Sequence, residues 1–169
     1  TLAESLTGSY VGIATDDWKD VLAETSSASA HALTGSQHSI ASGRLAHALG
    51  LYGPCISFNT SCASAMTALH TAIRAVRGSE CDTGLVAGVN MVLSPGSMSI
   101  MANAGLTSER CYTFDRRAGG YVRAEAINAS TLSTGDHEGL LAVLGSAIRA
   151  TGFSVSLTAP NAASQQLVI

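Results

Sequence analysis

The pattern of apolar and polar residues along the chain has two periods: short runs are typical of strands, and longer segments have helical spacing. Side chains return to the same face every two residues on a strand and about every 3.6 residues on a helix, so the two periods predict different elements. The short runs predict strands at residues 10–15, 56–58, 85–89, 126–132 and 140–147. The longer segments predict helices at residues 16–24, 36–49 and 98–104, and one from just after Cys62 to Gly78. Asp16 is expected to cap the first of these helices and Gly50 to close the second. A small-residue linker is expected at 26–30, and a charged loop at 107–120.

The helix that follows Cys62 has the clearest pattern. Its apolar residues share one face, which predicts packing against a sheet; they are Ala65, Met66, Ala68, Leu69, Ala72, Ile73 and Val76. This helix lies between the predicted strands at 56–58 and 85–89, and a long connection with its own helix favours parallel strands. The order of elements therefore predicts an α/β fold with a mostly parallel sheet.

Composition narrows the classes of function. Of the 169 residues, 46% are hydrophobic and only 12% are charged, and the net charge is −3. Globular domains usually have about 25% charged residues, so this composition suits a deeply buried core or a large subunit interface. A weakly acidic chain without a basic run has no electrostatic footprint for nucleic acid. Two long spans lack charge, but their Asn, His, Ser and Pro residues argue against a transmembrane segment. The first residues have neither a Met nor a signal-peptide pattern, and we expect the chain to be part of a longer protein.

The four cysteines, Cys55, Cys62, Cys81 and Cys111, show no metal-ligand spacing and are too few for a disulfide framework. We expect such cysteines to be small buried hydrophobic residues, with Cys62 as the exception. Cys62 lies among small residues where a predicted strand meets a predicted helix, so its thiol would lie at the positive end of that helix. This position favours a thiolate and nucleophilic acyl transfer. The alternative is a cysteine that packs at a helix start without chemistry.

The residues around Cys62 also resemble a known family. The runs Leu33-Thr34-Gly35, Ser42-Gly43-Arg44-Leu45 and Asn59-Thr60-Ser61-Cys62 are similar to the β-ketoacyl synthases, in particular the ketosynthase domains of type I polyketide synthases. Further similar runs follow in the same order: Ala87-Gly88-Val89-Asn90, Leu93-Ser94-Pro95, Phe114-Asp115, Gly120-Tyr121-Val122-Arg123 and Leu157-Thr158-Ala159-Pro160-Asn161. The similarity extends from about residue 10 to the end of the chain.

The resemblance implies a thiolase-like, layered α-β-α-β-α fold. Residues 1–169 would form a partial β-ketoacyl synthase domain, namely most of the N-terminal half and the start of the C-terminal half. Cys62 would carry the growing acyl chain as a thioester, and a malonyl-type extender would lose carbon dioxide and condense with it. An acyl carrier protein would deliver both substrates on its phosphopantetheine arm, with no cofactor or metal bound to the chain itself. The family further implies a homodimer, other polyketide synthase domains in the same polypeptide and a cytoplasmic location, without nucleic acid or a membrane span.

The same resemblance gives expectations for other residues of the chain. The family's two catalytic histidines lie in motifs beyond Ile169, so the 169 residues alone are predicted not to catalyse condensation. None of the five histidines present matches a catalytic position, and His70 is expected to be structural. Where the family has glycines, this chain has Ala124-Glu125-Ala126-Ile127-Asn128, which would strain the site if those glycines need positive φ angles. Arg123 and Glu125 are expected either to pair and fix this loop or to form a solvated surface pair. Asp115 is expected to cap or brace the loop.

Three functions stay open. The first is a condensing acyltransferase, and the second is a catalytically impaired ketosynthase-like module for dimerisation or interaction. The third is another thiolase-superfamily enzyme that acts on coenzyme A thioesters. Non-catalytic relatives in the family lack the cysteine, so the presence of Cys62 favours the first function. The segments Phe114-Asp115 and Thr158-Ala159-Pro160-Asn161 argue against the third.

Overall fold

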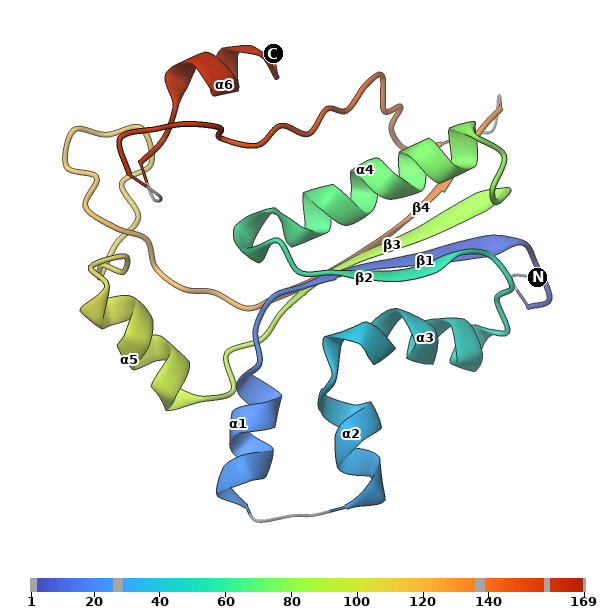
Figure 1. The fold of residues 1–169 in the computed structure, drawn as a ribbon, viewed down its shortest axis with the longest axis horizontal. Helices are drawn as coiled ribbons and strands as arrows, with labels where there is room; N and C mark the ends of the chain where they lie inside the picture. Colours follow the sequence, from blue (N-terminus) through green and yellow to red (C-terminus); the bar gives the residue numbers. More distant parts are fainter. Residues whose placement is uncertain (1–2, 26–28, 136–138, 157–158, 169) are drawn as a thin grey trace. The chain divides into compact units, whose positions relative to one another are not determined.

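The computed structural model describes residues 3–25, 29–135, 139–156 and 159–168. The chain divides into two compact units, Thr1–Ser133 and Thr134–Ile169. The first unit has a four-stranded sheet with helices on both faces (Figure 1). In chain order, its elements are β1 (Thr7–Ile13), α1 (Asp17–Glu24), α2 (Ala30–Ser36), α3 (His38–Leu49), β2 (Cys55–Phe58), the short 3₁₀ helix η1 (Ser61–Ala63), α4 (Ser64–Arg77), β3 (Thr83–Asn90), α5 (Pro95–Asn103) and β4 (Ala126–Ser133).

The strands of the sheet lie in the order β2-β1-β3-β4. β1 is parallel to both β2 and β3, and β4 is antiparallel to β3. The connection from β2 through α4 to β3 therefore joins two parallel strands, with β1 between them. This arrangement confirms the predicted α/β fold with a mostly parallel sheet.

The core lies between the sheet and α4, which covers one face while α3 lies on the other (Figure 1). Ala68, Ala72, Ile73 and Val76 of α4 are buried, as the spacing of apolar residues predicts. Ala65 and Met66 at the start of the helix were predicted on the same face but are exposed. Tyr10 is fully buried beside the buried residues of α4, and its hydroxyl lies 3.6 Å from Sγ of Cys81. Burial, followed by the hydrogen bond with Cys81, raises the pKa of Tyr10 well above its ordinary value, so this hydroxyl stays neutral.

Two glycines allow α4 to approach the sheet closely. A Cβ atom on Gly12 of β1 would lie 2.4 Å from the backbone N of Ala65, and one on Gly88 of β3 would lie 2.8 Å from Cβ of Ala65. Gly12 and Gly88 are opposite each other in the register of β1 and β3. The first turn of α4 therefore rests directly on the backbone of two neighbouring strands, which fixes where Cys62 lies.

Several predicted boundaries are wrong. The helix expected at 36–49 is confirmed as α3, which begins two residues later, at His38. A separate helix that was not predicted, α2, precedes it and ends at Ser36, because Gln37 has an extended backbone. α5 begins at Pro95, three residues earlier than predicted, because the side chain of Ser94 caps it. Asp16 precedes α1 as expected, but its side chain makes no capping hydrogen bond.

The predicted ends of α3 and α4 are confirmed, and the predicted linker at 26–30 is only partly described. Gly50 closes α3 in the left-handed conformation, as predicted. Gly78 follows α4 as predicted, although the positive φ angle falls on the next residue, Ser79. The linker expected at 26–30 lies partly outside the described residues, and α2 already begins at Ala30.

The second unit has little regular structure among its described residues. A short helix, α6 (Ala162–Gln166), begins after Asn161, whose side chain accepts hydrogen bonds from the backbone N–H groups of Ala163 and Ser164. The strand predicted at 140–147 is wrong, because residues 141–150 are irregular. A strand needs a hydrogen-bonded neighbour, and no strand in the described part of the chain pairs with this segment.

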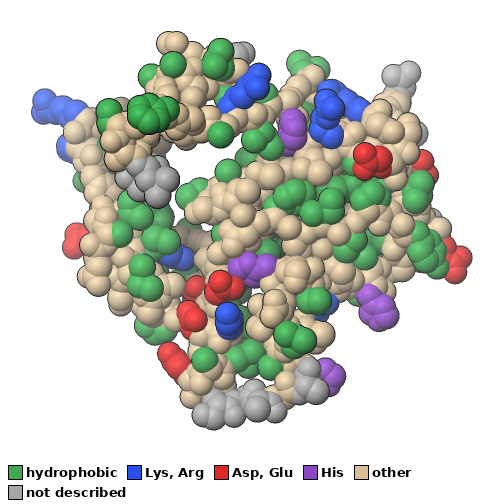
Figure 2. Space-filling view, in the orientation of Figure 1, with side chains coloured by type: hydrophobic (Ala, Val, Ile, Leu, Met, Phe, Trp, Pro, Cys, Tyr) green, Lys and Arg blue, Asp and Glu red, His purple; other side chains and the backbone are tan. Residues whose placement is uncertain are grey.

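The surface agrees with the low share of charged residues. On the face shown in Figure 2, charged side chains are scattered, and apolar side chains lie along α4. Among the described residues, no helix is both long enough and apolar enough to cross a membrane.

Candidate active site

Cys62 lies in a sharp turn between a strand and a helix. β2 ends at Phe58, Cys62 is the central residue of η1, and α4 begins two residues later at Ser64. Ser61, directly before the cysteine, has a φ angle of +54°. A left-handed backbone at a residue other than glycine costs about 1–3 kcal/mol and is often found at functional sites. The turn is therefore a strained elbow that presents the cysteine at the start of α4.

A network of small polar side chains holds this elbow. The hydroxyl of Ser64 accepts a hydrogen bond from the backbone N of Thr60 (2.9 Å) and donates one to the carbonyl of Ser61 (2.7 Å). The side chain of Asn59 accepts a hydrogen bond from the backbone N of Ser61 at 3.3 Å. Ser64 itself is buried. These bonds support the strained residue on both sides, which explains why the conformation persists.

The thiol of Cys62 is accessible. Cys62 is exposed and lines a pocket of about 470 Å³ in the first unit. β1 and β3 form part of the wall through Gly12 and Gly88, and α5 contributes Met101. The hydroxyl of Ser61 lies 3.7 Å from Sγ of Cys62. The pocket thus leaves open space beside Cys62.

The segment from Tyr121 to Ala126 forms another wall of this pocket and is fastened to β3. The side-chain amide of Asn90 donates to the carbonyl of Ala124 at 2.6 Å, and Glu125 accepts a hydrogen bond from the backbone N of Val92 at 2.9 Å. No residue from 124 to 128 has a positive φ angle. The departures from the family's glycines therefore cause no backbone strain of the expected kind.

Arg123 and Glu125 do not form the expected ion pair with each other. Glu125 binds the backbone of Val92, whereas Arg123 lines the Cys62 pocket, where its Nε atom is buried without a hydrogen-bond partner. The side chain of Asp115 makes two hydrogen bonds with Arg117, both 2.9 Å long, and so braces its own turn rather than the loop of Arg123 and Glu125. The guanidinium of Arg117 in turn lies 4.4 Å from the ring centre of Tyr112.

Asp17 is a buried carboxylate that the sequence pattern does not single out. Only 3% of its surface is exposed, and burial alone would raise its pKa. Hydrogen bonds from Ser94, Leu93 and Ser97, with the positive charge of Arg123, outweigh this effect and hold the pKa of Asp17 below its ordinary value. No local signal could have found this residue, because its partners lie far along the chain.

The other cysteines differ from the prediction. Only Cys81 is buried, whereas Cys55 and Cys111 are exposed. Cys55 lies on β2 at the edge of the sheet, and Sγ of Cys111 accepts a hydrogen bond from the backbone N of Val122 at 3.1 Å. Exposure alone therefore does not distinguish Cys62, but its place at the elbow and in the pocket does.

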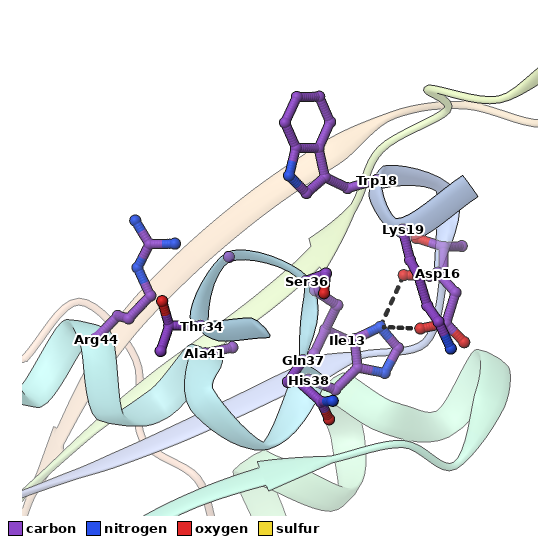
Figure 3. Close-up of a pocket in the computed structure, with 12 residues that line it drawn as sticks. Ile13, Asp16, Trp18, Lys19, Thr34, Ser36, Gln37, His38, Ala41 and Arg44 are labelled. Carbon is purple, nitrogen blue, oxygen red and sulfur yellow. Dashed lines mark hydrogen bonds and ion pairs between the residues drawn. The ribbon is translucent and has the colours of Figure 1, made fainter. Parts of the chain in front are cut away.

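A second, smaller cavity of about 120 Å³ lies among α1, α2 and α3 (Figure 3). His38 points into this region, with Nε2 2.8 Å from the carbonyl of Thr15 and 3.2 Å from the carboxylate of Asp16. This histidine therefore joins α3 to the start of α1 and lies apart from the elbow. His70 is half-buried on α4, His31 and His47 are exposed, and His137 lies outside the described residues.

The fold and the site together define a class: an α/β protein with an accessible cysteine at a strained strand-to-helix elbow. Residues 1–137 match the family described as "Beta-ketoacyl synthase, N-terminal domain". The chain therefore belongs to the β-ketoacyl synthase family, and its fold is the thiolase-like α/β fold of ketosynthases.

Individual relatives are polyketide synthases. The chain is 38% identical over 178 residues to "Erythronolide synthase EryA3" of Saccharopolyspora erythraea, covering 100% of this chain and 6% of the relative. It is 35% identical over 176 residues to "Mycocerosic acid synthase-like polyketide synthase" of Mycolicibacterium smegmatis, covering 99% of this chain and 8% of the relative. Among solved structures, the ketosynthase from module 6 of the bacillaene synthase of Bacillus subtilis 168 superposes with a TM-score of 0.84 at 31% identity. That match covers 99% of this chain and 30% of the ketosynthase, so the chain spans less than a third of the solved domain.

Proposed function

We propose that the protein containing this chain is a condensing acyltransferase of the 3-oxoacyl-[acyl-carrier-protein] synthase type, in polyketide or fatty-acid biosynthesis. The observation that carries the proposal is Cys62, exposed in η1 immediately before α4 and open to a pocket of about 470 Å³. In this proposal, residues 1–169 are part of one ketosynthase domain, and the remainder of that domain supplies the catalytic histidines.

The first half-reaction needs only the elbow and an acyl thioester. The thiolate of Cys62 attacks the thioester carbonyl, a new carbon–sulfur bond forms, and the carrier's thiolate leaves and takes up a proton. The partial positive charge at the start of α4 would stabilise the oxyanion of the tetrahedral intermediate. The pocket walls offer a surface along which the acyl chain can lie.

In the second half-reaction, a malonyl-type extender loses its carboxylate as carbon dioxide. The electron pair of the broken carbon–carbon bond forms a carbanion, which attacks the Cys62 thioester. The product is a β-ketoacyl thioester on the carrier, and Cys62 leaves as a thiolate ready for another cycle. The extender and the acyl chain would both arrive on the phosphopantetheine arm of an acyl carrier protein.

The partners are inferred from the family and from one surface. β2 lies at an edge of the sheet with Cys55 and Ile56 exposed, and such an edge can pair with the same strand of a second copy. We infer a homodimer across β2, with other polyketide synthase domains in the same polypeptide. Ile56→Lys is expected to shift the protein to a monomer by light scattering, whereas a dimer of unchanged stability would contradict this interface. The cytoplasmic location stays a prediction.

The decisive experiment is acylation of the whole protein by a short acyl thioester, followed by peptide mass spectrometry. We expect one acyl group per chain on Cys62, and none in a Cys62→Ala variant. Cys111 is the internal control, because it is also exposed but lies outside the pocket and outside β2. Label on Cys55 or Cys111 with Cys62 unmodified would overturn the proposal. Acylation of Cys62 without condensation when a malonyl thioester is added would instead support the impaired, non-condensing module.

A further inference from the structure

Asp17 connects two segments that border the Cys62 pocket but are far apart in the sequence. Ala14 and Thr15, which line the pocket, lead from β1 into α1, and Asp17 is the first residue of α1. Met101 lines the pocket from α5. The carboxylate of Asp17 binds the start of α5, so it ties one wall of the pocket to the other.

The connection is made by a single oxygen atom. Oδ2 of Asp17 accepts hydrogen bonds from the backbone N of Leu93 (2.9 Å), the backbone N of Ser94 (3.1 Å) and the hydroxyl of Ser97 (3.0 Å). These donors include backbone N–H groups at the beginning of α5, where a negative charge is favoured. Because the carboxylate is buried, losing its charge or its place would leave these donors without an equivalent acceptor.

Asp17 also shapes the electrostatics of the pocket. Among the described residues that line the pocket, Arg123 alone carries a full charge. Its guanidinium interacts electrostatically with Asp17, and its buried Nε atom has no hydrogen-bond partner. The carboxylate therefore offsets a cation that would otherwise stand unbalanced beside an apolar acyl chain.

We propose that Asp17 is a positioning residue that fixes the α5 wall of the acyl pocket and thereby limits the length of acyl chain that Cys62 accepts. This inference rests on the proposed function, since it concerns the chain that the cysteine would carry. Asp17 does not touch the sulfur. It acts through α5, whose residue Met101 lines the pocket.

The test compares two matched pairs of variants in the whole protein. Asp17→Asn removes the buried charge with little change in size, and Asp20→Asn makes the same change at an exposed position of the same helix. Ser97→Ala removes one donor to Asp17, and Ser99→Ala removes an exposed hydroxyl of α5 that bonds to the carbonyl of Pro95. The rate of Cys62 acylation is measured with a short and a long acyl thioester, such as propionyl and octanoyl, and hydrogen exchange is measured at the amides of Leu93 and Ser94.

We expect Asp17→Asn to raise the ratio of the long-chain to the short-chain rate about tenfold, the size of effect that one methylene has in a hydrophobic pocket. Ser97→Ala should raise the ratio by a smaller factor, and Asp20→Asn and Ser99→Ala should leave it within about twofold. An equal fall in both rates would assign Asp17 a purely structural role and overturn the inference. If Asp17→Asn does not fold, the pair of Ser97→Ala and Ser99→Ala decides in the same way.

Hydrogen exchange separates this inference from the proposed function. If the wild-type protein is never acylated at Cys62, the proposed function fails, together with the part of the inference that concerns chain length. The positioning of α5 is still judged by exchange: faster exchange at Leu93 and Ser94 in Asp17→Asn than in Asp20→Asn supports it. Unchanged exchange overturns it.

Discussion

Replacing Gly12 with alanine should move the elbow that holds Cys62. A Cβ atom at this position would lie 2.4 Å from the backbone N and 2.6 Å from Cα of Ala65. Ordinary contacts begin near 3.4 Å, so the start of α4 must move away from the sheet by about 1 Å, because backbone atoms cannot rotate aside as a side chain can. Overpacking of this kind costs about 1–3 kcal/mol of unfolding free energy.

The effect on chemistry should exceed the effect on stability. A displacement of about 1 Å at a reacting group can reduce a rate by about 100-fold, so we expect Cys62 acylation in Gly12→Ala to fall by roughly that factor. The assay combines urea unfolding with the acylation rate at Cys62, measured by mass spectrometry. Gly43→Ala is the matched control: its Cβ would meet only Sγ of Cys55, at 4.0 Å, and alanine inside α3 should stabilise the protein by about 0.5–1 kcal/mol.

A second pair of variants examines the same geometry at β3. Gly88→Ala places a Cβ 2.8 Å from Cβ of Ala65, so removing that atom with Ala65→Gly should restore much of the acylation rate. The same Ala65→Gly change should not rescue Gly12→Ala, because there the obstruction is backbone. If Gly12→Ala acylates at the wild-type rate, the close approach of α4 does not fix the position of Cys62 and the reasoning fails.

Two further predictions follow from the hydrogen bonds. Ser64→Ala should destabilise the protein by about 1–3 kcal/mol, because it leaves the backbone N of Thr60 and the carbonyl of Ser61 without their hydrogen-bond partner. Urea unfolding measures this loss with Ser99→Ala as the control, and equal stability of the two variants would contradict the prediction. Because the pKa of Asp17 is held below its ordinary value of 3.8, its contribution to stability is complete above about pH 4 and is lost as the pH falls through the lowered value. The unfolding free energy of Asp17→Asn should therefore depend less steeply on pH below 4 than that of wild type, and parallel pH profiles would refute this assignment.

The elements that the sequence predicted correctly are those with strong local patterns. The helix α4 and the strands around it depend on residues close together in the chain, and the structure contains these elements. The apolar face of α4 is buried from Ala68 onward, whereas Met66 is exposed. The errors occur where tertiary partners decide. Residues 140–147 have strand character, but no neighbouring strand in the described chain pairs with them. The helix α2 was not predicted, because Ala30–Ser36 contains only one large apolar residue, Leu33.

The site shows the same division. Cys62 could be singled out because small residues, a strand end and a helix start are adjacent in the sequence. Asp17 could not, because its partners Leu93 and Ser94 lie more than seventy residues away and a pair of acidic residues before a helix normally predicts a cap. From the sequence, Arg123 is expected to pair with Glu125, its nearest opposite charge along the chain. In the structure, Arg123 instead interacts electrostatically with Asp17, which is distant in the sequence.

The features described above that position Cys62 all lie in the first unit. Their location suggests that the two half-reactions of the proposed mechanism depend on different parts of the domain. The close approach of α4 at Gly12 and Gly88 places the elbow, and Ser64 supports the strained residue before the cysteine. Asp17 fastens α5 beside the pocket. In the proposed mechanism, loading an acyl chain needs this thiol and a pocket, whereas decarboxylation needs the histidines that we expect in the remainder of the domain. A protein that keeps this unit but loses the later histidines should therefore still accept an acyl group on Cys62, and its failure would appear only when an extender must be decarboxylated.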